Sequence, residues 1–201
     1  MQNSIKNRET GFTLVELLIA MAISLFVLTS LSSAFISQRK TFDAQEQVTE
    51  MVQGARGAMD IISRDIKMAG YDPTGVGIVG IPFISGQLEI RADLNGDGDT
   101  ADFNETIIYT ENTGTIKRQE GLTTPVTLAE NIPSGTFTFG IKYFEKNGTT
   151  PVTSSANEGN IRQVDITITT QTSKRDPNYG PNNGYRRYTL SSCVTPPNLD
   201  L

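Results

Sequence analysis

The amino-acid sequence predicts an α+β fold in which a long N-terminal helix packs on an antiparallel β-sheet domain. No proline precedes Pro73, and an apolar segment at 12–36 runs into an amphipathic segment at 37–72, so one uninterrupted helix is expected. Over residues 73–201 the composition changes to short β-branched and aromatic runs separated by Gly, Asn and Pro. Such runs are typical of strands joined by turns, which predicts a β-rich globular domain.

The apolar segment is long enough to cross a membrane. Over residues 12–28 only Thr13, Glu16 and Ser24 interrupt the apolar side chains, and the run continues to Ile36. A membrane-spanning helix needs about 17–25 such residues. A cleaved secretory signal is the alternative interpretation, but its apolar core is normally only about 7–15 residues long.

Basic residues flank this segment on both sides. Lys6 and Arg8 precede it, and Arg39 and Lys40 follow it. Cations ahead of a membrane span favour a cytoplasmic N-terminus, although the cations behind it weaken the asymmetry. We therefore expect a single-pass membrane protein whose C-terminal domain lies on the non-cytoplasmic side.

One carboxylate, Glu16, lies near the start of the apolar segment. A charge at the centre of a bilayer costs about 2.5–3.5 kcal/mol, so a buried carboxylate at this position is expected to have a cationic partner. The alternative is that the Glu16 side chain reaches the lipid headgroups.

Residues 11–16, GFTLVE, followed by the apolar helix, resemble the processing site of type IV prepilins and type II secretion pseudopilins. The resemblance implies that residues 1–11 are a leader peptide, that a prepilin peptidase cuts between Gly11 and Phe12, and that Phe12 becomes N-methylated. It also implies that Glu16 docks on the new amine of Phe12 in a neighbouring subunit. Because the two residues are four apart on one helical face, the pair could also close within one subunit.

The second half of the predicted helix has a continuous apolar stripe. Its members are spaced alternately by four and three residues: Val48, Val52, Ala55, Met59, Ile62, Ile66 and Ala69. Gly70 and Pro73 are typical of a helix end. Gly54 and Gly57 weaken the middle of the helix and allow a bend or a close approach to the sheet.

Seven strands are predicted after the helix: Gln87–Arg91, Thr106–Thr110, Thr115–Gln119, Val126–Ala129, Thr136–Phe144, Arg162–Thr172 and Arg186–Cys193. Apolar and polar residues alternate most clearly in the fifth and sixth strands. These two are expected to form an antiparallel pair with one face on the helix stripe and the other in water.

Residues 62–73 and 186–199 resemble the matching segments of PilW-like minor pilins, although Pro197 replaces the arginine that usually begins their Arg-Asn-Leu terminus. This resemblance implies a minor pilin that is inserted in the inner membrane with a periplasmic C-terminal domain and then enters a cell-surface type IV pilus. The implied partners are other major and minor pilins, the prepilin peptidase, the inner-membrane assembly platform and membrane lipid. A minor pseudopilin of a type II secretion system is the alternative.

An acidic, glycine-containing segment lies between the first two predicted strands, and its spacing matches the first half of an EF-hand calcium loop. The candidate calcium ligands are Asp93, Asn95, Asp97, Asp99, Asp102 and Glu105. The second half departs from the EF-hand pattern, because position 12 is Asn104 and the glutamate follows one place later. Calcium is therefore an expected cofactor, with a solvated acidic hairpin as the alternative. A calcium-dependent adhesin at the pilus tip would be a function of another class.

Composition argues against several other classes of function. The chain contains no histidine, which removes the Ser-His-Asp triad and every zinc site that needs imidazole. Its net charge of −5 gives little support to nucleic-acid binding. The single cysteine, Cys193, excludes an intramolecular disulfide; a half-buried position near a strand end is expected, against an intermolecular bridge or a reactive thiol. We therefore predict a structural protein and not an enzyme.

Overall fold

The computed structural model describes residues 11–133 and 139–200. It forms two compact units, residues 1–45 and 46–201, and each is considered separately. Of the predicted leader, only Gly11 is among the described residues. The predicted strand at 136–144 also begins outside them, so its first three residues are not described.

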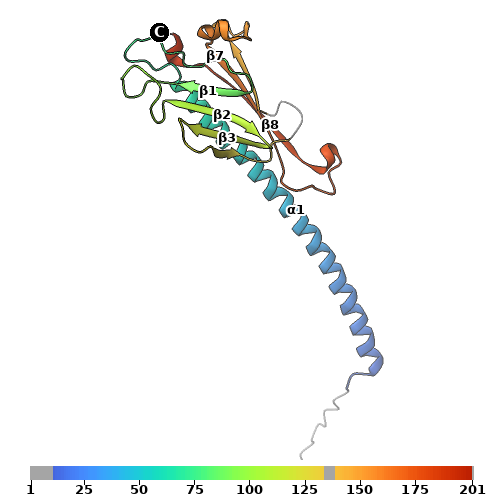
Figure 1. Ribbon diagram of the computed structural model, residues 1–201. Helices are drawn as coiled ribbons and strands as arrows, with labels where there is room; N and C mark the ends of the chain where they lie inside the picture. Colours follow the sequence, from blue (N-terminus) through green and yellow to red (C-terminus); the bar gives the residue numbers. More distant parts are fainter. Residues whose placement is uncertain (1–10, 134–138, 201) are drawn as a thin grey trace, which may run out of the picture. The chain divides into compact units, whose positions relative to one another are not determined.

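The predicted N-terminal helix is α1, Leu14–Met68, with 55 residues (Figure 1). It is continuous through Gly54 and Gly57. A Cβ atom added at either glycine would meet no atom within 4 Å. These glycines therefore do not mark a close approach of the helix to the sheet.

The apolar stripe of α1 packs into the core of the unit 46–201. Five of its predicted members are buried, whereas Val48 and Val52 at the beginning of the unit are half-buried. The buried helix face also includes Met51, Ala58 and Asp65. Asp65 accepts hydrogen bonds from the Tyr109 hydroxyl and from Arg118 Nε at 2.7 Å, which compensates for burying its carboxylate.

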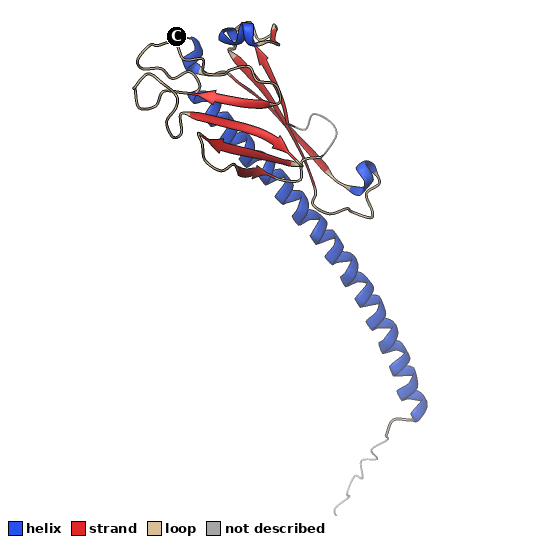
Figure 2. Ribbon diagram, viewed as in Figure 1, coloured by secondary structure: helices blue, strands red, loops and turns tan. Residues whose placement is uncertain are grey.

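The predicted antiparallel β-rich domain is confirmed, and its strands form two four-stranded sheets (Figure 2). The first has the order β1-β2-β3-β4, with bounds Gln87–Arg91, Thr106–Asn112, Thr115–Glu120 and Val126–Ala129. The second has the order β6-β5-β7-β8, with bounds Pro151–Val152, Phe139–Phe144, Gln163–Gln171 and Arg187–Val194. Strand β6 was not predicted, and neither were the 3-10 helices η1 (Ser155–Asn160), η2 (Pro181–Gly184) and η3 (Pro197–Asp200).

Both sheets and α1 contribute to one hydrophobic core. Ile62 and Ile66 of α1, Tyr109 of β2 and Ile166 of β7 all belong to it. The predicted pairing of β5 with β7 is confirmed. In β7 buried and half-exposed residues alternate along the whole strand, so one face covers the core and the other faces solvent, as expected.

Cys193 is exposed, which contradicts the expected half-buried position. It is the next-to-last residue of β8, where alternate side chains point away from the core, and it lies opposite Asp165 of β7. Partial desolvation of the sulfur and the Asp165 carboxylate together raise the pKa of the thiol. The thiol therefore stays protonated near neutral pH.

Gly70 and Asn198 cap the C-terminal end of α1. Gly70 has φ +73°, the left-handed conformation that ends many helices. Its N–H donates to the Arg91 carbonyl at 2.9 Å. Asn198 Nδ2 lies 3.4 Å from the carbonyl oxygen of Lys67, so the predicted helix end at Gly70 is confirmed and a C-terminal side chain caps it.

Candidate functional site

The first candidate site is the N-terminal end of α1. By its length and composition, this helix is long and apolar enough to cross a membrane. All residues of the segment 14–36 are exposed in the described chain. Its apolar surface therefore has to be covered by lipid or by other protein.

Thr13 and Glu16 form a capping box at the start of this helix. The Thr13 N–H and hydroxyl donate to Glu16 Oε2 at 2.8 and 2.9 Å. In return the Glu16 N–H donates to Thr13 Oγ1 at 3.3 Å. The pair satisfies N–H groups that have no partner within the first helical turn.

This capping box was missed by the sequence reasoning, although its T-x-x-E spacing was visible. It also explains why α1 begins at Leu14 and not at Phe12 as predicted, because an N-cap residue lies outside the helix. Phe12 precedes the cap and is 91% exposed. The Gly11–Phe12 peptide bond is consequently exposed and lies outside the helix.

The second candidate site is the acidic loop between β1 and β2, residues 92–105. Asp93 is fully buried, and its carboxylate accepts the N–H groups of Gly96 at 2.6 Å and Gly98 at 3.0 Å. Glu105 is also buried, and it accepts the N–H groups of Leu94 and Asn95. These two carboxylates hold the turn in place from opposite ends.

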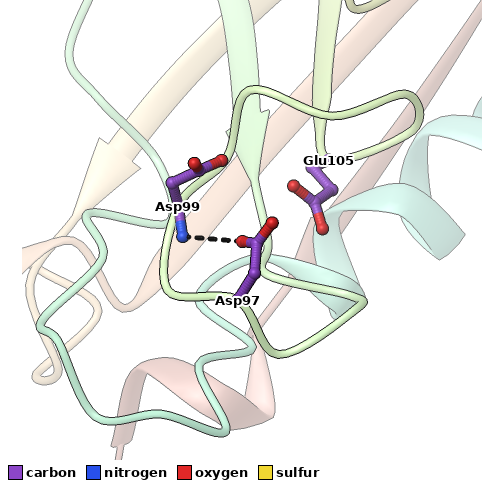
Figure 3. Close-up of side chains that lie close together, drawn as sticks. All are labelled: Asp97, Asp99 and Glu105. Carbon is purple, nitrogen blue, oxygen red and sulfur yellow. Dashed lines mark hydrogen bonds between the residues drawn. The ribbon is translucent and has the colours of Figure 1, made fainter.

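Three carboxylates of the loop converge. Oxygen atoms of Asp97, Asp99 and Glu105 lie within 4.8 Å of one another (Figure 3). Among the described residues, no Lys or Arg side chain forms an ion pair with any of them. Like charges at this separation repel, and a shared cation would relieve the repulsion.

The other predicted ligands lie beside this group in different roles. Asn95 donates from its Nδ2 to Asp97 at 3.1 Å and to Asp102 at 2.7 Å. Asp93 is occupied by backbone donors, as described above. The loop therefore presents three converging carboxylates out of the six predicted ligands. Oxygen-only donors of this kind suit a hard cation such as Ca²⁺.

Residues 6–32 match the family described as the prokaryotic N-terminal methylation motif. Among solved structures, the type IV-like pilin TTHA1219 from Thermus thermophilus matches with a TM-score of 0.48 and 14% sequence identity, covering 75% of this chain and 98% of that one. No curated protein sequence matches the chain. The chain thus carries an N-terminal methylation motif at the capped start of its long helix.

Proposed function

We propose that this chain is a minor pilin of the PilW-like type, a structural subunit and not an enzyme. It is inserted in the inner membrane with its C-terminal domain in the periplasm, and it then enters a cell-surface type IV pilus to prime or support assembly. The observation that carries the proposal is the match of residues 6–32 to the N-terminal methylation motif. The exposed apolar helix that continues from the motif supports it.

Processing would begin at the exposed Gly11–Phe12 bond. A prepilin peptidase adds water across this amide, which leaves a carboxylate on Gly11 and an ammonium group on Phe12. A methyl group is then transferred from a methylsulfonium donor, which leaves as a thioether, to the Phe12 nitrogen, which gives up a proton. The capping box favours this reaction, because the helix begins two residues after the scissile bond and leaves its backbone accessible.

Docking would use the carboxylate of Glu16. Both hydrogen bonds from Thr13 reach its Oε2 atom, and among the described residues its Oε1 atom has no hydrogen-bond donor. Oε1 can therefore accept the Phe12 amine of a neighbouring subunit while Oε2 keeps the cap. In an apolar helix bundle such an ion pair compensates two charges that would each be costly alone.

Three variants separate docking from capping. Glu16→Gln keeps the acceptor that a capping box needs but removes the charge, and Glu16→Ala removes both. Thr13→Ala keeps the charge and removes the capping hydroxyl. We expect all three to be cleaved to a chain that begins at Phe12, as measured by mass spectrometry. We also expect only the two Glu16 variants to lose incorporation into filaments.

Two outcomes would contradict this model. Normal incorporation of Glu16→Gln would mean that Glu16 acts only as a capping residue. A mature chain that still begins at Met1 would remove the pilin proposal altogether.

The alternative is a minor pseudopilin of a type II secretion system. Both assemblies would use the same helix, and other pilins, the prepilin peptidase and an inner-membrane platform would be partners in either. Deleting the gene separates them: a pilus subunit is expected to change the number of surface pili, and a pseudopilin the amount of secreted enzyme.

We also propose that the acidic loop binds calcium. The convergence of Asp97, Asp99 and Glu105 supports this, and Asp93, Asn95 and Asp102 would complete or orient the ligand set. Extracellular calcium modules of this kind bind with Kd values of about 10⁻⁴–10⁻³ M. A calcium-dependent tip adhesin would need this loop, and binding of the protein to cells or glycans only with calcium would support that function.

Calorimetry on the detergent-solubilised chain tests the calcium proposal. We expect calcium to release or absorb heat on binding and to raise the melting temperature, and both effects should disappear in Asp97→Asn/Asp99→Asn. The exposed helix variant Asp60→Asn is the control and should bind normally. No heat and no thermal shift with the unchanged chain would rule calcium out.

A further inference from the structure

The loop between β7 and β8 concentrates positive charge. Together with Arg187, the first residue of β8, it carries Lys174, Arg175 and Arg186 against one acid, Asp176, in a chain whose net charge is −5. The acidic loop has the opposite composition, because no Lys or Arg occurs between Arg91 and Lys117 in the sequence. The unit 46–201 is therefore electrostatically asymmetric.

Internal contacts hold the basic loop in a defined shape. Arg186 donates from Nη2 to Asp176 Oδ2 at 2.8 Å and lies over the Tyr179 ring at 4.8 Å. Hydrogen bonding from Arg186 lowers the pKa of Asp176, so this pair remains charged and internally neutralised. The Asp176 N–H also donates to the Gly184 carbonyl at 2.8 Å, which closes the loop.

Three cations remain on its surface. Lys174, Arg175 and Arg187 are exposed, and none forms an ion pair with a described residue. We name these three residues the basic surface. It is fixed beside the beginning of the unit, because the Lys174 N–H donates to Gln47 Oε1 at 2.8 Å.

Three exposed carboxylates, opposite in charge to the basic surface, lie at the other end of the unit 46–201. Asp97, Asp99 and Asp102 are exposed, and we name them the acidic surface. Their loop is tied to the end of α1, because the Asp93 N–H donates to the Tyr71 carbonyl at 2.8 Å. Figure 1 shows the two loops at opposite ends of the unit 46–201.

The two surfaces cannot neutralise each other within one molecule. Residues 47 and 68 of α1 are separated by about 32 Å at 1.5 Å per residue. This length exceeds the Debye length, about 8 Å at physiological ionic strength. Each surface therefore remains available to a second molecule.

We propose that, when the acidic loop holds no calcium, the basic surface of one chain docks on the acidic surface of a second copy, in a head-to-tail contact. The inference rests on the proposed function in one respect, namely that the membrane helix inserts all copies in the same direction. Parallel copies that are displaced along the helix axis bring the basic end of one beside the acidic end of the next. Because this contact uses two different surfaces, it can repeat from copy to copy.

Cysteine cross-linking of the full chain in its native membrane tests the contact. The experiment uses a Cys193→Ser background with Asn178→Cys in the basic loop and Ala101→Cys in the acidic loop, treated with oxidant in the presence of a chelator. A head-to-tail contact gives a ladder of cross-linked species, whereas a two-fold contact stops at dimers. We expect Lys174→Glu/Arg187→Glu to reduce the ladder by about tenfold.

Reversing the charges of the basic surface and of the acidic surface, separately and together, is the decisive test of the contact. Asp97→Lys/Asp99→Lys should reduce the ladder equally, and combining all four changes should restore it, which also shows that the variants fold. The matched control Lys117→Glu/Lys142→Glu reverses two charges outside both surfaces and should leave the ladder unchanged.

Three results would overturn the inference: no ladder, a ladder insensitive to reversal, or a loss that the fourfold variant does not restore. If the ladder is lost, is not restored by the fourfold variant and depends on the content of anionic lipid, the basic surface binds lipid phosphates and not a second copy. The proposed function is checked separately in the same cells. A chain that is processed to Phe12 and enters filaments, but gives no ladder, would contradict the docking contact alone.

Discussion

Asp65 shows how a single polar residue is accommodated in the core of this protein. It is 5% exposed, and it accepts hydrogen bonds from Tyr109 and Arg118, of which Arg118 also pairs with Glu120. Burial, followed by the nearby Asp65 carboxylate, raises the pKa of the Tyr109 hydroxyl, so Tyr109 remains a donor at all physiological pH values. The network joins α1 to β2 and β3 by charge-assisted hydrogen bonds.

Replacing Asp65 should therefore destabilise the fold. We expect Asp65→Ala to lower the free energy of unfolding by about 2–3 kcal/mol, less than the loss for a fully buried ion pair, because Arg118 keeps Glu120 and partial access to water. Urea denaturation of the detergent-solubilised chain measures this value. Asp60→Ala, an exposed acid on the same helix, is the control and should change it little. Equal effects of the two variants would contradict a role for the network.

The lowered pKa of Asp72 predicts that the stability of the folded protein depends on pH in the acid range. Backbone N–H donation, with Gly77 the largest contribution, lowers its pKa to about 2 from the ordinary value of 3.8. A lowered pKa in the folded state contributes stability above pH 3.8, and this contribution is lost as the pH falls from about 4 to 2. We expect Asp72→Asn to unfold with a shallower pH dependence in that range. Identical acid-unfolding curves for the two proteins would contradict this assignment.

At the scale of elements, the junction between α1 and β1 depends on close backbone contact. A Cβ atom on Gly80 would lie 2.2 Å from the Gly70 nitrogen, and backbone atoms cannot move aside as a flexible side chain can. The Gly80 carbonyl also accepts the Arg91 N–H at 2.8 Å. The end of the helix is therefore fixed against the first strand by two glycines.

Two glycine-to-alanine changes should consequently have opposite signs. We expect Gly80→Ala to destabilise the protein by about 1–3 kcal/mol because it forces the backbone apart. We expect Gly57→Ala in the open helix to stabilise it by up to about 1 kcal/mol. Thermal unfolding followed by circular dichroism measures both. Destabilisation by Gly57→Ala would indicate a contact of that helix face that the isolated chain does not have.

At the scale of the whole molecule, the hydrophobic core belongs to the unit 46–201. Its helix members begin at Met51, and the apolar segment 14–36 contributes none. We expect a chain truncated to residues 46–201 to remain soluble and to unfold cooperatively in calorimetry. A chain truncated to residues 70–201 should lose that transition, because it lacks the helix face that fills the core. A retained transition in the shorter chain would show that the sheets fold without α1.

Local patterns determined the helix, most of the strands and the position of the methylation motif. The 3.6-residue and two-residue periods depend on residue type alone, so the stripe ending at Ala69 and the alternation in β7 were readable before any contact was known. The order of residues in the acidic loop indicated six candidate ligands, but it did not indicate that Asp97, Asp99 and Glu105 would be the ones to converge. The capping box was also local, and it was missed only because Glu16 was interpreted through its charge.

Only the tertiary structure decided how these elements meet. Contacts between residues that are distant in sequence produce the division into two sheets, the salt bridge of Asp65 and the capping of α1 by Asn198. The exposure of Cys193 likewise depends on how distant elements pack. The same holds for the separation of the basic and acidic surfaces along α1. The physical reason is that a pattern shows which face of an element will be buried, whereas the partner of that face depends on how all elements pack together.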